Sequence, residues 1–184
     1  MLRILDIVLA GVGLLVALPL LAILFLIGMF DTGAPLFRQV RVGQHKRPFT
    51  LVKFRTMKPD TQSVATHLAD PAAVTALGAF LRRTKLDELP QLWNVFKGEM
   101  SLVGPRPCLF NQEELVAERD SRGVFAARPG ITGLAQIRGI DMSTPRLLAE
   151  TDARMLEGLG VPAYFAYIVK TVTGSGSGDR IRQG

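Results

Sequence analysis

The feature that most constrains this chain is a run of 24 residues without a charged side chain, from Ile7 to Phe30. As an α-helix this run would be about 36 Å long, because each residue adds about 1.5 Å. The hydrocarbon core of a bilayer is about 30 Å thick, so the length permits a membrane span. A cleaved signal peptide fits less well, because its apolar region is shorter and a small-residue cleavage site follows it, whereas Asp31 and Thr32 follow here.

A proline divides this apolar run into two arms. Pro19 is the thirteenth of the 24 residues, and a proline inside a helix removes a backbone donor and favours a kink. Each arm of about 12 residues would reach about 18 Å, close to the depth of one leaflet. The helix can therefore cross the bilayer, or enter it, bend at Pro19 and leave on the same side. Arg3 before the run and Arg38 and Arg41 after it favour a cytoplasmic position for both ends.

The remainder of the chain has the composition of a folded domain. Apolar residues make up 48% of the sequence, which suffices for a core, and the single Cys108 excludes an internal disulfide and a paired-cysteine metal site. Two short runs rich in Val and Phe lie within 36–57, and the polar segment 43–48 between them predicts a β-hairpin.

Helical patterns dominate after the hairpin, so we expect an α+β, mainly helical fold. Residues 109–120 predict an acidic surface helix, and the glycine-rich segment 128–139 predicts a mostly extended loop. The apolar stretch 164–172 is too short to span a bilayer and suits a core helix or an interfacial helix equally. The other helices are predicted over 76–86 and 88–97, and again from 145 onward.

The residues with the clearest chemical potential are the adjacent carboxylates Asp87 and Glu88. Pro90 is tolerated in the first turn of a helix, which predicts Asp87 at or near the N-cap and Glu88 at the helix start. Both carboxylates would then converge on a ligand at the helix end. A plain capping arrangement, with Thr84 and Asp87, is the alternative and is the commoner role for such a dipeptide.

Cationic side chains surround this pair, and the chain as a whole has a net charge of +6. Arg82 precedes the pair, and Arg106 follows it between two prolines that fix the backbone. Lys53 and Arg55 are two residues apart on the second predicted strand and therefore share a face. Carboxylates among arginines fit a metal-assisted transfer of a phosphoryl group, whereas a basic surface that attracts anionic lipid is the simpler alternative.

A third candidate element is the segment RPGITGLAQ, residues 128–136. Its glycines allow backbone N–H groups to approach a ligand closely, and Arg128, Thr132 and Gln136 are potential donors to a phosphate or a base. An ordinary turn explains the same glycines. The sequence has no Walker lysine motif, no dinucleotide fingerprint and no nucleophile-elbow serine.

Four sequence blocks, taken together, resemble a known family. FRQVRVG, KFRTM, LDELPQLWNVFKGEMSLVGPRP and RPGITGLAQ occur in this order, as in the bacterial sugar transferases called monotopic phosphoglycosyl transferases. The resemblance covers about residues 3–139, is looser over 140–173 and does not extend to the tail. Relatives often carry Trp at the position of Leu134 and Gly-Arg-Asn where this chain has Gly139-Ile140-Asp141, so sugar or uridine contacts in that region are not carried over.

The resemblance implies a reaction. Family members transfer a phosphosugar from a UDP-sugar to polyprenyl phosphate and release UMP, with Mg²⁺ as cofactor, in the first membrane step of surface glycan assembly. By this resemblance Asp87 is the nucleophile that forms a covalent phosphosugar intermediate, and Glu88 helps to hold Mg²⁺. The phosphate groups would be held by Lys53, Arg82 and Arg106.

The resemblance also implies an arrangement at the membrane. It favours the re-entrant path, with the helix of residues 1–30 broken near Pro19, a catalytic domain with interfacial amphipathic helices over 31–173 and a flexible tail over 174–184. The expected location is the bacterial inner membrane, with the active site on the cytoplasmic face, and the chain resembles the minimal form of the family. The expected partners are the UDP-sugar, polyprenyl phosphate and membrane lipid, without nucleic acid, and a homo-oligomer remains open.

Two other functions compete with this interpretation. In a non-enzymatic membrane adaptor the arginines would bind anionic lipid, and Asp87 and Glu88 would only cap a helix. In an active transferase of a different specificity the donor would carry a nucleotide other than uridine. The sequence names neither the sugar nor the glycan pathway.

Overall fold

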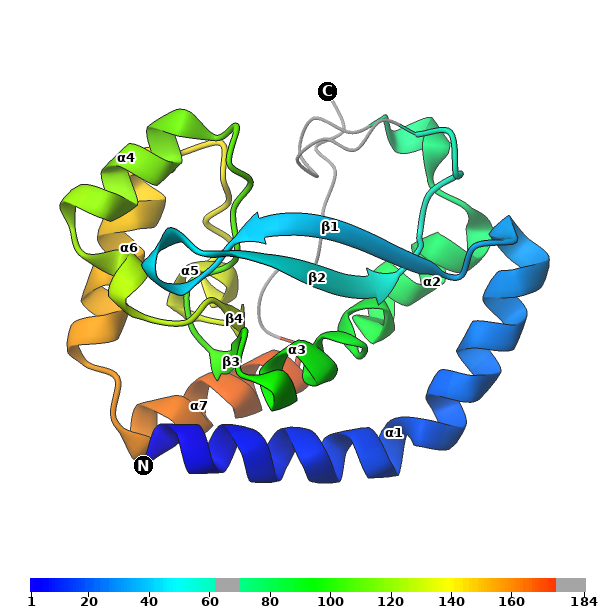
Figure 1. Ribbon diagram of the computed structural model, residues 1–184, viewed down its shortest axis with the longest axis horizontal. Coiled ribbons are helices and arrows are strands. Elements are labelled where there is room, and N and C mark those ends of the chain that lie inside the picture. Colours follow the sequence, from blue (N-terminus) through cyan, green and yellow to red (C-terminus); the bar gives the residue numbers. More distant parts are fainter. Residues whose placement is uncertain (62–69, 175–184) are drawn as a thin grey trace.

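A computed structural model describes residues 1–61 and 70–174 of the chain. Its longest element is helix α1, Leu2–Thr32, which ends at Gly33 in the left-handed conformation with φ 69°. Pro19 lies inside this helix, and Figure 1 shows α1 as two arms joined by a bend. The predicted kink is therefore present as a bend, but the helix is not broken, because its helical assignment continues through the proline. The predicted tail lies outside the described residues from 175 onward.

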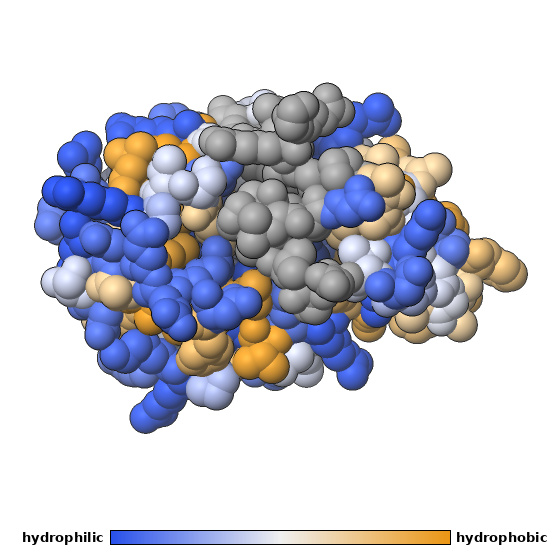
Figure 2. Space-filling model, turned by 90° about the horizontal axis from the view of Figure 1, so that it is seen from above, coloured by the Kyte–Doolittle hydropathy of each residue, from blue (hydrophilic) through white to orange (hydrophobic). Residues whose placement is uncertain are grey.

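Few residues of α1 are buried against the rest of the protein: Asp6, Ala10, Leu24 and Gly28. By length and composition it is the one helix within residues 1–61 and 70–174 that is able to cross a membrane. Its apolar side chains are largely exposed, with Leu15 at 74% and Phe30 at 92%. Seen from above, hydrophilic side chains dominate the left half of the molecule, with apolar patches among them, and pale orange apolar side chains project at the right-hand end (Figure 2).

The N-terminal arm of α1 is nevertheless fixed to the domain. Asp6 is 3% exposed, and its Oδ1 accepts hydrogen bonds from Ser101 Oγ at 2.9 Å, from the backbone N–H of Leu102 at 2.9 Å and from Tyr164 Oη at 2.8 Å. Arg3 donates to the carbonyl of Val95 at 2.8 Å. The charged residues at the start of α1 therefore join it to three other elements.

The predicted hairpin is confirmed. Strands β1, Leu36–Val42, and β2, Pro48–Phe54, pair antiparallel, with Leu36 opposite Phe54 and Val42 opposite Pro48. Val42, Leu51 and Phe54 are among the buried side chains that tie the hairpin to the core. A short helical turn, Gln44–Lys46, connects the strands.

Two short helices and a separate turn follow the hairpin. Helix α2 spans Ala76–Thr84, and helix α3 spans Gln91–Lys97. Between them lies a 3-10 turn, Leu86–Glu88. The predicted helices over 76–86 and 88–97 were thus too long at this junction, because Lys85 adopts the left-handed conformation with φ 59° and ends α2.

The segment 128–139 is more ordered than predicted. Strand β4, Gly130–Thr132, pairs in parallel with β3, Ser101–Val103, and helix α5, Leu134–Ile137, follows it. A Cβ atom on Gly130 would lie 2.0 Å from the backbone N of Gly104. This close approach requires a glycine, which is one reason for the glycine-rich sequence.

The last helices close the domain on two sides. Helix α4, Glu113–Ser121, packs against α6, Pro145–Glu157, and α7, Val161–Val172, runs beside the lower arm of α1 (Figure 1). The predicted acidic surface helix is confirmed as a helix, but it also buries Leu115 and Arg119. The predicted α+β, mainly helical class therefore holds, with two small sheets.

Candidate functional site

The carboxylate pair lies in the turn between α2 and α3. Lys85 reverses the chain, its carbonyl accepts from the backbone N–H of Glu88 at 3.3 Å, and Pro90 is the N-cap of α3. The pair therefore precedes α3 rather than starting it. Asp87 is 1% exposed, whereas Glu88 is half-buried. The predicted capping alternative is not seen for Thr84, whose hydroxyl donates to the carbonyls of Phe80 and Leu81.

The structure brings Arg106 to this pair. The guanidinium of Arg106 lies 3.4 Å from Oε1 of Glu88, with about a quarter of the arginine side chain exposed. Arg106 belongs to a loop, Gly104 to Pro107, that directly follows β3, and the carbonyl of Pro105 in that loop accepts from the N–H of Gly130 at 2.8 Å. Arg106 lies 18 positions after Glu88 in the sequence, so the fold creates this contact.

Two buried arginines donate hydrogen bonds to backbone carbonyls of the same loop. Arg119 of α4 donates to the carbonyl of Arg106 at 2.8 Å, and Arg41 of β1 donates to the carbonyl of Pro107 at 3.1 Å. Arg119 also forms two bonds to Oδ2 of Asp152, at 3.0 and 2.7 Å. We expect these contacts to restrict the loop that carries Arg106. Sequence reasoning did not find Arg119 and placed Arg41 only in the basic flank of α1.

The other predicted phosphate ligands lie along the hairpin and α2. Arg82 Nε donates to Thr56 Oγ1 at 2.9 Å. Lys53 Nζ lies 5.8 Å and Arg55 Cζ 5.6 Å from the ring centroid of Phe37, so the two cations do share a face. Arg55 also donates to the carbonyl of Ala34 at 2.8 Å, which engages part of its guanidinium in the fold. These cations are thus placed by side chains and backbone of the hairpin region.

The three predicted donors of the glycine-rich segment each bind protein atoms. Arg128 Nε donates to the carbonyl of Gly98 at 2.9 Å, and Gln136 Nε2 donates to the carbonyl of Ile131 at 2.8 Å. Thr132 Oγ1 lies 2.5 Å from Thr171 Oγ1 of α7. Of the three, Thr132 alone lines the cavity described next.

A cavity of about 430 Å³ adjoins Glu88. It lies between the end of α2, α3, both strands of the small parallel sheet and the end of α7. Its walls are mainly aliphatic, and polar side chains from the end of α2 line it together with Glu88. The apolar residues that line it are Leu89, Leu92, Leu102, Ile131, Ile168 and Val172.

The donor set of the turn is suited to Mg²⁺. This ion is usually bound through one or two carboxylates, with water and substrate phosphates completing its shell. Asp87 and Glu88 supply two consecutive carboxylates, and Arg106 lies 3.4 Å from Oε1 of Glu88. No cluster of three or more His, Cys, Asp or Glu side chains that would hold an ion by itself occurs in residues 1–61 and 70–174. The arrangement therefore fits an ion that a phosphorylated substrate helps to bind.

Comparison with known sequences shows the family to which the chain belongs. The model of the bacterial sugar transferase family matches residues 1–176, and the chain belongs to this family. The chain is 49% identical over 108 residues to the "Uncharacterized sugar transferase EpsL" of Bacillus subtilis, an alignment that covers 58% of this chain and 53% of the relative.

Two further relatives have more specific names. The UDP-glucose:undecaprenyl-phosphate glucose-1-phosphate transferase of Caulobacter vibrioides is 39% identical over 162 residues, which cover 82% of this chain and 61% of the relative. The exopolysaccharide production protein ExoY of Rhizobium meliloti is 35% identical over 187 residues, which cover 91% of this chain and 81% of the relative. The chain spans 29–60% of the length of four of its curated relatives, EpsL among them.

Proposed function

We propose that this protein transfers a phosphosugar from a UDP-sugar to a polyprenyl phosphate such as undecaprenyl phosphate and releases UMP. The observation that carries the proposal is the turn in which Asp87 and Glu88 lie side by side with Arg106 at 3.4 Å from Glu88. The names of relatives that act on undecaprenyl phosphate support the choice of acceptor.

The proposed reaction has two displacements at phosphorus. A carboxylate oxygen of Asp87 attacks the sugar-bearing phosphorus of the donor, the bond to the UMP oxygen breaks, and UMP leaves with the electron pair. An oxygen of the lipid phosphate then attacks the same phosphorus and displaces Asp87, which returns to a carboxylate. Because Asp87 is 1% exposed, we expect the donor to displace protein atoms before the first step.

The surrounding side chains would neutralise the negative charge of the phosphates. Arg106 is placed to bind a phosphate oxygen next to Glu88, and Arg82 and Lys53 lie on neighbouring elements. Mg²⁺, when bound, would supply further positive charge at the phosphates, with Glu88 as a ligand. Arg55, Arg128, Thr132 and Gln136 remain candidates for substrate contacts, although each also has a partner within the fold.

The proposed location is the cytoplasmic face of the bacterial inner membrane. The exposed apolar surface of α1 suits lipid, and its bend suits a re-entrant path in which both ends stay on one side. The donor is soluble and the acceptor chain is in the bilayer, so the reaction has to take place at the interface. Helix α7, which packs on the first turns of α1, would lie at this surface.

The test is UMP release by purified protein with undecaprenyl phosphate, Mg²⁺ and a panel of UDP-sugars. Asp87→Asn removes the nucleophile, and we expect a loss of at least about 10³-fold in rate. Asp120→Asn is the matched control, because Asp120 is half-exposed and pairs with Lys46 outside the site. Removal of Mg²⁺ with a chelator should abolish release, and its re-addition should restore release.

Two results would contradict this proposal. Normal UMP release by Asp87→Asn would exclude Asp87 as the nucleophile. Tight binding to anionic vesicles without UMP release from any donor would favour the membrane adaptor.

A further inference from the structure

The cavity beside Glu88 presents mostly apolar surface to a ligand. Six aliphatic side chains supply most of this surface, and the hydroxyls of Thr132 and Thr171, which also line the cavity, contact each other at 2.5 Å. Its volume of about 430 Å³ is nevertheless in the range of small-molecule sites. Such a cavity is suited to a hydrocarbon ligand.

We infer that this cavity binds the isoprenoid units of the acceptor that lie next to its phosphate. The inference rests on the proposed function and specifies where the second substrate binds. A polyprenyl chain is longer than the cavity, so the rest of the chain would remain in the bilayer.

The charged residues of the cavity indicate where the phosphate end of the acceptor would bind. Arg83, Thr84 and Lys85 line it from the end of α2, and Glu88 lines it from the following turn. Two cations match the charge of a lipid phosphate, whereas the aliphatic walls match its chain. A phosphate bound by these cations would lie in the same cavity as Glu88, which directly follows Asp87 in the chain.

The position of the cavity in the fold also suits a ligand that arrives from lipid. Leu92 lines the cavity and at the same time packs on α1, because a Cβ atom added to Gly13 would lie 3.2 Å from Leu92 Cδ1. Ile168 and Val172 belong to α7, an apolar helix that runs beside the lower arm of α1 (Figure 1). One wall of the cavity is therefore part of the surface that carries the membrane helix.

The first experiment fills the cavity with a larger side chain. Ile168→Trp places an indole among the lining residues, and we expect the KM for undecaprenyl phosphate to rise about tenfold or more, while the KM for the UDP-sugar stays within about twofold. Val169→Trp is the matched control, because Val169 is the next residue of α7, is 57% exposed and does not line the cavity. An unchanged acceptor KM in folded Ile168→Trp would overturn the inference.

The second experiment does not depend on turnover. A farnesyl phosphate with a diazirine on its first isoprenoid unit is photolysed with the Asp87→Asn protein in nanodiscs, and the labelled residues are mapped by mass spectrometry. We expect labels on the lining residues of α3 and α7, and we expect unlabelled undecaprenyl phosphate, but not inorganic phosphate, to reduce them. Labels confined to the arms of α1, or competition by inorganic phosphate alone, would overturn the inference.

The two experiments separate this inference from the proposed function. Specific labelling of the cavity without UMP release from any donor would support the cavity as a polyprenyl phosphate site and reject the transfer reaction. UMP release that Asp87→Asn abolishes, together with labels outside the cavity, would support the reaction and reject this site for the acceptor.

Discussion

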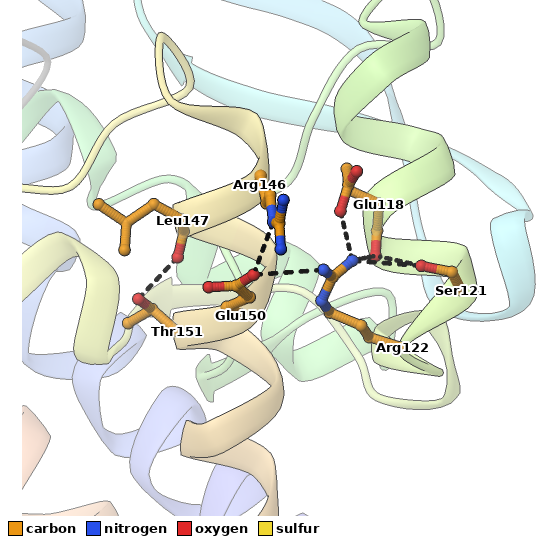
Figure 3. A network of polar contacts seen from close by, with 7 residues as sticks. All are labelled: Glu118, Ser121, Arg122, Arg146, Leu147, Glu150 and Thr151. Carbon is orange, nitrogen blue, oxygen red and sulfur yellow. Dashed lines mark hydrogen bonds and ion pairs between the residues drawn. The ribbon is translucent and has the colours of Figure 1, made fainter.

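Helices α4 and α6 are joined by ion pairs in two places, one inside the protein and one at its surface. Inside, Arg119 and Asp152 are 2% and 1% exposed and lie 2.7 Å apart. At the surface, Arg122 contacts Glu118 of its own helix and Glu150 of α6, and Arg146 lies 3.0 Å from Glu150 (Figure 3). Both places pair arginine with a carboxylate, aspartate inside and glutamate at the surface, and the two places differ most in burial.

The pKa values of the two acids are shifted in opposite directions, by different causes. Desolvation raises the pKa of Asp152 above its ordinary value, although Arg119 acts against this shift. The hydrogen bond from Arg146 lowers the pKa of Glu150. In the inner pair, each buried charge would be unfavourable without the opposite charge beside it. In the outer group, water also solvates each charged side chain.

The two groups also differ in what else they touch. Arg119 has a third contact, to the carbonyl of Arg106, and so connects the inner pair to the candidate site. Arg122 donates to the carbonyl of Glu118 within its own helix. The comparison teaches that the buried pair contributes to the geometry of the site, whereas the surface group only joins two helices.

The largest effect should follow from removing one partner of the buried pair. Asp152→Ala leaves the guanidinium of Arg119 buried without its carboxylate, so we expect a loss of about 3–5 kcal/mol in the free energy of unfolding. Denaturant titration of the protein in nanodiscs measures this loss. A change below about 1 kcal/mol would mean that the inner and outer pairs are equivalent.

A smaller effect should follow from Arg119→Lys, which keeps the charge but lacks the planar fork. A single ammonium cannot reproduce both the bonds to Asp152 and the bond to the Arg106 carbonyl. We expect kcat for UMP release to fall about tenfold as Arg106 loses its fixed position. A loss of stability with unchanged kcat would restrict Arg119 to a structural role.

The surface group should tolerate the corresponding change. Arg122→Gln removes the contacts to Glu118 and Glu150 drawn in Figure 3. Because exposed pairs contribute little, we expect Tm to change by less than about 2 °C and the rate of UMP release to stay the same. Thermal unfolding followed by circular dichroism is the measurement, and a shift as large as that of Asp152→Ala would refute the comparison.

The smallest effect should be the loss of the stabilising contribution of Glu150 at acidic pH. The lowered pKa of Glu150 means that its ionised form is favoured in the folded state, so its contribution is present above its ordinary value of 4.5 and is lost as the pH falls through the lower, folded value. We expect a small difference in Tm between the wild type and Glu150→Gln at about pH 6 that disappears by about pH 3. A difference that grows on acidification would contradict this sign.

Local patterns in the sequence predicted the elements that depend on neighbours in the chain. The uncharged run predicted α1, and the two Val- and Phe-rich runs predicted the hairpin, because hydrophobic spacing and a polar turn determine both. Asp87 and Glu88 were identified as candidates because two adjacent carboxylates lie there among several cationic side chains. The unbroken course of α1 through Pro19 was not predicted, because packing decides whether a proline breaks or only bends a helix.

Contacts between distant residues could not be read in this way. Arg119 follows a run of acidic residues and resembles any surface cation, since its partner Asp152 lies 33 residues further on. Strand β4 has three residues and pairs with β3, so that Gly130 of β4 lies opposite Ser101 of β3. Such short segments have no periodicity of their own, so the extended loop predicted over 128–139 missed both the strand and α5.

The three hydrogen bonds to Asp6 have a consequence for how the protein works at a bilayer. They join α1 to β3 and α7 without an intervening linker. If α1 is embedded as we propose, the catalytic turn has a fixed height above the lipid, because the domain cannot swing away from its anchor. The attachment of α1 would then set the distance between the catalytic turn and the membrane. An acceptor phosphate would be reached only when it lies at that height.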